Sequence, residues 1–217
     1  MRSVDRRAAG MLALLLAALA GCGAVAPRPE VGVAAPAARA PAAEAPVAPA
    51  LRQEYDRALG LIKAGRLAQA EPRLRRLADE NPDLAGPPAN LGIIYYRQDR
   101  LLEAEEALAR AARINPRSAA IQNQLGMVLR AAGRFDAARQ AYARALDIDP
   151  GHAHAHLNIG ILYDLYLAKP DQALVHYQRY QALQPREDQL VAKWIFELKQ
   201  RSQTAGQGAR GVAGGKG

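Results

Sequence analysis

The sequence predicts an all-α fold, a superhelical solenoid of about four helix-turn-helix repeats followed by a C-terminal capping helix. Two observations support this prediction. Four prolines recur at intervals of 34, 34 and 35 residues, at Pro82, Pro116, Pro150 and Pro185. Small and large apolar residues repeat in register with these prolines. A fixed period of this length is typical of stacked helical hairpins, in which each repeat packs only against its neighbours.

The chain begins with a segment that is typical of exported proteins. A basic stretch from Met1 to Arg7 precedes an apolar run, residues 8–20, and the sequence at its end reads Leu19-Ala20-Gly21-Cys22. The run has roughly 13 residues, too few for the ~20 that a membrane-spanning helix needs. A basic flank, a short apolar core and small residues together predict a secretory signal peptide over residues 1–21.

Residues 19–22 resemble the lipobox of bacterial lipoproteins. The resemblance implies that the sulfur of Cys22 carries two acyl chains, such as palmitate, and that Cys22 becomes the mature N-terminus. Cys22 is the single cysteine of the chain, so no intramolecular disulfide can form. The residue after it is Gly23 and not the Asp that marks inner-membrane retention, which favours the outer membrane, facing the periplasm. The alternative is a secretory signal that merely contains a cysteine.

Residues 22–50 are rich in alanine and proline. Repeated proline blocks helix formation and favours the extended polyproline II conformation. We therefore predict that this segment links the lipidated N-terminus to the folded domain.

Four repeats follow, and the terminal prolines set their boundaries at 51–84, 85–118, 119–152 and 153–187. Small residues are expected where the two helices of a repeat approach closely, as at Gly92 with Ala104 and at Gly126 with Ala138. Large residues fill the spaces between neighbouring hairpins. The fourth repeat contains one extra residue after Tyr163, which predicts a slightly longer first helix. An amphipathic segment, residues 188–201, is expected to cap the stack, and the Gly-rich residues 202–217 are expected to be disordered.

The repeated Leu-Gly, Tyr, Ala and Pro positions in residues 51–187 resemble those of the tetratricopeptide repeat. The resemblance implies a non-enzymatic protein that binds a partner in the concave groove lined by the first helix of each repeat. The usual groove positions fall on eleven residues of this sequence: Tyr55, Asn90, Ile93, Tyr96, Arg97, Asn123, Gln124, Met127, Arg130, Asn158 and Ile161. The amides are suited to bond a peptide backbone, and the arginines to pair with acidic groups. An equally weighted alternative is that the amides make local helix contacts.

Other classes of function have less support. The net charge of +8 is spread among many acidic residues and forms no basic stripe, so nucleic acid is not an expected partner. His152, His154 and His156 alternate with alanine, and this spacing places His152 and His156 on one face of a helix and His154 on the opposite side, so all three cannot bind one ion. A metal-binding or small enzymatic protein that uses this cluster is therefore the unlikely alternative, and no cofactor is predicted.

The sequence thus predicts a lipid-anchored scaffold of the cell envelope that binds a protein partner through its groove during assembly of an envelope complex. A pilotin-like factor for type IV pilus or secretin assembly is one specific form of this function. The membrane contact is expected through the lipid on Cys22 alone.

Overall fold

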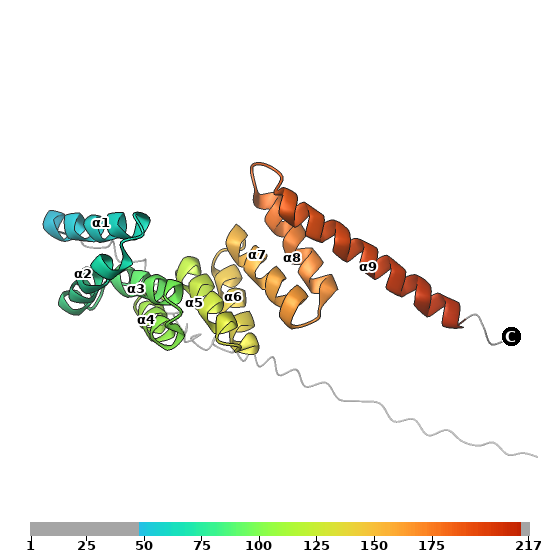
Figure 1. The fold of residues 1–217 in the computed structure, drawn as a ribbon, viewed down its shortest axis with the longest axis horizontal. Coiled ribbons are helices and arrows are strands. Elements are labelled where there is room, and N and C mark those ends of the chain that lie inside the picture. Colours follow the sequence, from blue (N-terminus) through green and yellow to red (C-terminus); the bar gives the residue numbers. More distant parts are fainter. Residues whose placement is uncertain (1–47, 214–217) are drawn as a thin grey trace, which may run out of the picture. The chain divides into compact units, whose positions relative to one another are not determined.

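The computed structural model describes residues 48–213, with side chains up to residue 202, and this part of the chain is helical without a strand. Figure 1 shows the helices following one another as hairpins. Their bounds are α1 Pro49–Lys63, α2 Leu67–Glu80, α3 Gly86–Arg97, α4 Leu101–Ile114, α5 Ala119–Ala131, α6 Phe135–Ile148, α7 Ala153–Ile161, the π-helix η1 Leu162–Tyr166, α8 Pro170–Leu183 and α9 Gln189–Ala213.

Each hairpin packs mainly against itself and the next one. The pairs α1–α2, α3–α4, α5–α6 and α7–α8 form the hairpins, and α2–α3, α4–α5 and α6–α7 join them. This sequential packing is that of a solenoid and confirms the predicted fold class. We call α1, α3, α5 and α7 the first helices and their shared side, which carries the eleven predicted groove residues, the first-helix surface.

The turns inside the hairpins share one backbone feature. Gly65, Asp99, Gly133 and Ala168 all have positive φ, between 51° and 74°. They lie at equivalent places in the four repeats, because the chain must reverse direction there in the left-handed region.

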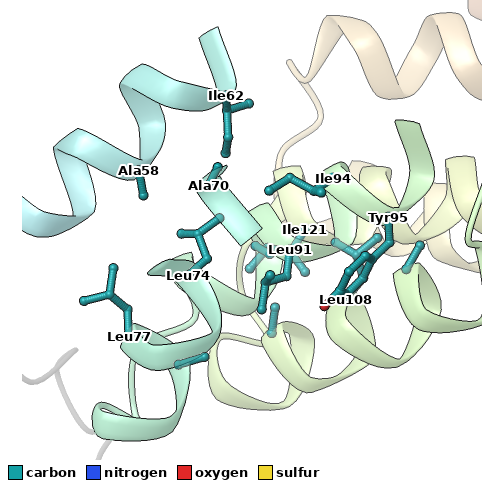
Figure 2. Close-up of a cluster of buried hydrophobic side chains, with 14 of the residues drawn as sticks. Ala58, Ile62, Ala70, Leu74, Leu77, Leu91, Ile94, Tyr95, Leu108 and Ile121 are labelled. Carbon is teal, nitrogen blue, oxygen red and sulfur yellow. The ribbon is translucent and has the colours of Figure 1, made fainter. Parts of the chain in front are cut away.

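In the described part of the chain, the apolar core between the helices consists of three clusters of buried side chains. Figure 2 shows part of this core, where Leu74 of α2, Leu91 of α3 and Leu108 of α4 are buried together. Ion pairs at the edge link successive second helices. Glu71 pairs with Arg100 at 3.0 Å. Glu105 and Arg134, which lie 34 residues after Glu71 and Arg100, form the same ion pair one repeat later. Successive hairpins are therefore fixed by apolar packing inside and by a repeated charge pair outside.

The extra residue of the fourth repeat is absorbed in η1. The backbone N–H of Leu167 donates to the carbonyl of Leu162, five residues earlier, over 3.1 Å. A π-turn holds one residue more than an α-turn. The first helix of this repeat thus runs from Ala153 to Tyr166, close to the predicted length.

The capping helix α9 packs on α8, where Val191 and Leu198 are buried. It is longer than predicted, because it continues past Arg201 to Ala213 and includes most of the segment expected to be disordered. Glycine disfavours a helix, but an existing helix gains a hydrogen bond with every residue it adds. At the other end, α1 starts at Pro49, inside the predicted linker.

Among the described residues, no helix combines the length and apolarity needed to cross a membrane. Cys22, the signal peptide and most of the linker lie outside the described residues.

Candidate functional site

The predicted groove residues all lie on first helices. Tyr55 is on α1, four residues are on α3, four on α5, and two on α7. Most are partly exposed, whereas Arg97 is exposed and Asn123 is buried. The stack therefore presents these side chains together along one series of helices.

Two of the amides bond to the neighbouring repeat. Asn90 Nδ2 donates to the Tyr55 hydroxyl over 2.6 Å, and Asn158 Nδ2 donates to Asn123 Oδ1 over 3.0 Å. Each bond joins residues 35 positions apart, so the same contact recurs two repeats later. Asn90 and Asn158 thus help to hold adjacent first helices together.

Two of the predicted groove residues on α5 carry polar atoms without a partner. Gln124 Oε1 and Arg130 Nη1 are both buried and have no hydrogen-bond partner. Buried polar atoms almost always find a partner, so unpaired ones call for an explanation. On the first-helix surface, α5 therefore offers an acceptor and a donor that a bound partner can satisfy.

A tyrosine of α6, the second helix of the third repeat, packs against the first helix α5 from the side of α6. The ring of Tyr142 lies against Gly126, where an added Cβ would come within 2.5 Å of the ring. Tyr142 is fully buried, and its hydroxyl has no partner. Burial raises the pKa of Tyr142, while the nearby positive charge of Arg130 acts in the opposite direction. Tyr142 is not among the eleven predicted groove residues, and the pairing of Gly126 with a tyrosine is the signal that could have revealed it.

A cavity of about 800 Å³ lies between the fourth repeat and α9. Of the predicted groove residues, Ile161 reaches it. The other lining residues are Asp164, Leu165, Tyr177, Trp194, Phe196, Glu197, Gln200 and Arg201. Leu165 and Phe196 are exposed apolar side chains, so the cavity is open and largely apolar at its edge.

The histidines predicted as an unlikely metal cluster do not converge. His152 accepts a hydrogen bond from the backbone N–H of Ala155 and caps α7, and His154 is exposed. His156 instead pairs with His176 of α8, with their Nδ1 atoms 3.0 Å apart. Within residues 48–202, no three or more histidine, cysteine or acidic side chains are grouped for a metal ion.

The His156–His176 pair favours the neutral imidazoles. Burial, together with the nearby His156, lowers the pKa of His176 to about 4. Burial also lowers the pKa of His156, although the Pro150 carbonyl 3.1 Å from its Nε2 opposes this effect. Two positive charges at this separation would repel each other. The close contact of the two rings is therefore stable only when His156 and His176 are not both protonated.

Comparison with known proteins supports the fold. A family model described as tetratricopeptide repeat matches residues 83–150 and 117–186. No curated protein matches the chain.

Solved structures are similar along most of the described part. A structure of PilF from Pseudomonas aeruginosa has a TM-score of 0.65 and 24% identity, over 71% of this chain and 70% of that one. A thermophilic tetratricopeptide-repeat protein from Thermus thermophilus gives a TM-score of 0.59 and 25% identity, over 68% of this chain and 80% of that one. A crystal structure of MamA gives 0.56 and 23%, over 61% and 77%. Residues 83–186 therefore carry tetratricopeptide repeats, in a chain whose described part folds as a tetratricopeptide-repeat solenoid.

Proposed function

We propose that this protein is a non-enzymatic scaffold, which binds a segment of a partner protein on its first-helix surface and assists assembly of a complex in the bacterial cell envelope. A solenoid of rigid repeats offers an extended surface for such a segment. The observation that carries the proposal is the unpaired state of Gln124 Oε1 and Arg130 Nη1 on α5. A peptide segment supplies backbone N–H donors and acidic acceptors, which are the groups that these two atoms lack.

The proposal includes a lipid anchor on Cys22 and an outer-membrane location. The sequence of residues 1–23 supports both, through its signal peptide, its lipobox-like residues and Gly23. An anchor and a linker would keep the binding surface near the membrane and raise the effective concentration of a partner located there. A pilotin-like factor for pilus or secretin assembly is one function that this arrangement would serve.

Charge reversal on the first-helix surface tests partner binding. We expect that changing Arg97 and Arg130 together to glutamate abolishes partner capture, because the variant repels acidic groups that the native side chains attract. The measurement is affinity purification of the full-length protein from envelope extracts, followed by mass spectrometry. Circular dichroism should show unchanged helical content.

The matched control reverses the same amount of charge elsewhere. Arg113 on α4 and Arg144 on α6 are exposed residues of second helices. Changing both to glutamate should leave capture intact. If the Arg97 and Arg130 variant still captures the same proteins as the native chain, the first-helix surface is not the binding site.

The anchor has its own test. Changing Cys22 to serine removes the thiol that would carry the acyl chains, so we expect the protein to move from the membrane fraction to the soluble periplasmic fraction. Cell fractionation measures the location, and mass spectrometry of the native protein measures the added lipid mass. An unchanged location, or a native protein without lipid, would contradict the anchor while leaving the binding surface untouched.

A further inference from the structure

The cavity between the fourth repeat and α9 has apolar walls that are open to solvent. Its volume of about 800 Å³ lies within the roughly 300–1,000 Å³ that is usual for ligand sites. Leu165 of η1 and Phe196 of α9 both line it, yet they are 70% and 62% exposed. Trp194 also lines it, and its ring packs on that of Tyr177 with 5.4 Å between the centroids. Exposed apolar side chains gathered around a cavity are typical of a surface that another molecule covers.

The charged groups of the cavity leave one carboxylate in surplus. The Asp164 side chain is only 10% exposed, and Arg201 neutralises it by donating from Nη2 to Oδ1 over 3.2 Å. The second carboxylate that lines the cavity is that of Glu197. It pairs with Lys193 of the same helix, with 3.9 Å between Nζ and Oε1, and both side chains are more than half exposed. Such an exposed pair contributes little energy, so the Glu197 carboxylate is available to a second cation.

Apolar walls beside a surplus carboxylate select among the possible occupants of the cavity. An anionic lipid surface would be repelled by the carboxylate, and a purely apolar molecule would cover Glu197 without pairing its charge. A protein segment in which a basic residue stands between bulky apolar residues supplies both kinds of group. Its apolar side chains fit the walls, and its positive charge is complementary to that of Glu197.

We propose that this cavity is a second docking site for the partner protein, and that it receives a segment of this kind. The apolar side chains of the segment pack against Leu165, Trp194 and Phe196, while its basic group pairs with Glu197. The inference rests on the proposed function and adds a contact on α9, which carries none of the eleven predicted groove residues. A rigid solenoid with two separate contacts would hold a partner more tightly than either contact alone.

Trp194 is the single tryptophan of the chain, so its fluorescence reports on the cavity. The probes are acetyl-Leu-Lys-Phe-amide and two peptides with norleucine or glutamate in place of the lysine. Each is titrated into the purified full-length protein in nanodiscs of zwitterionic lipid. We expect a saturable change of Trp194 emission with the Lys peptide. The norleucine peptide should bind about three- to fivefold more weakly, because one exposed ion pair is lost, and the Glu peptide should bind most weakly.

Two variants separate the charge from the apolar walls. Glu197→Gln should bind the Lys and norleucine peptides equally. Phe196→Ala should bind both peptides about tenfold more weakly, because a large apolar contact is removed. The matched controls lie on α4, outside the cavity: Glu106→Gln removes an exposed carboxylate and Leu102→Ala an exposed apolar side chain. Both controls should retain native binding, and circular dichroism should show native helical content in all four variants.

Three results with the peptides would overturn the docking site: no change of Trp194 emission with the Lys peptide, equal affinity for the Lys and Glu peptides, or native affinity in Phe196→Ala. Light scattering examines a second copy of the chain as the occupant, and a dimer that dissociates in Phe196→Ala would also overturn the proposal. So would a change of Trp194 emission in anionic nanodiscs without peptide, which would assign the cavity to the membrane.

The docking site and the first-helix surface can fail separately. The peptide titrations concern the cavity alone. Loss of partner capture in the Arg97 and Arg130 variant would still support the first-helix surface if the peptides did not bind.

Discussion

Replacing Gly126 with alanine is expected to lower the free energy of unfolding by about 3 kcal/mol. The new Cβ would lie 2.5 Å from the ring of Tyr142, a distance at which one of the two groups must move. The ring cannot move easily, because Tyr142 is fully buried between the helices of the third repeat. Denaturant unfolding followed by circular dichroism measures the change, which is a large part of the roughly 5–15 kcal/mol typical of a domain.

The matched control is Gly60 in α1. An added Cβ there meets nothing within 4 Å. Alanine is favoured over glycine inside a helix by about 0.5–1 kcal/mol, so Gly60→Ala should stabilise the protein by this amount. Similar effects of the two substitutions would show that the close approach of α5 and Tyr142 is not a tight constraint.

The stability of the fourth repeat is expected to depend on pH through His176. The pKa of His176 is about 4 in the folded protein, against an ordinary value of 6.5 in the unfolded chain. As the pH falls below 6.5, the unfolded chain binds a proton that the folded protein does not, so stability decreases. The decrease ends near pH 4, where the folded protein also becomes protonated. We expect a total loss of about 1–2 kcal/mol, after allowing for the screening of a side chain that is only partly buried.

Several groups surround His176 and belong to this prediction. Tyr163 stacks on its ring at 5.6 Å between centroids, and His156 lies next to it. His152, Asp149 and Arg179 act in turn on His156. Thermal unfolding measured between about pH 7.5 and pH 4.5 should show a weaker pH dependence in His176→Gln than in the native protein. The exposed His154 is the control, and His154→Gln should retain the native pH dependence. An identical pH profile in His176→Gln would show that this ring does not control the stability.

The fold could be predicted from the sequence because the spacing of four prolines is a property of the chain itself. A repeat of this length packs only against its neighbours, so its sequence period is directly its structural period. The turns at Asp99 and Gly133 follow the same period, and both have the positive φ that reverses the chain. The C-terminal end of α9 was not predicted. The glycine content of residues 202–217 indicates a low helix preference, but it does not indicate how far a helix that already exists can extend.

The candidate site was predicted only in part. The period fixes which helix carries each groove residue, and the structure places all eleven on first helices. The period does not fix which polar atoms remain unpaired, because a hydrogen bond such as that from Asn90 to Tyr55 depends on the distance between neighbouring repeats. The contact of Tyr142 with α5 was missed because it also depends on the distance between two helices. The ring comes from α6 and packs against Gly126 of α5.

The π-helix Leu162–Tyr166 shows how a repeated architecture can accept a change in length. One added residue widens a single turn near the end of a first helix, and Ala173 and Tyr177 still reach their buried places. Insertions in this protein lineage would thus be tolerated best just before a hairpin turn, where the ladder of bonds can be re-paired locally. The same addition in the middle of a second helix would rotate every later side chain away from the neighbouring hairpin.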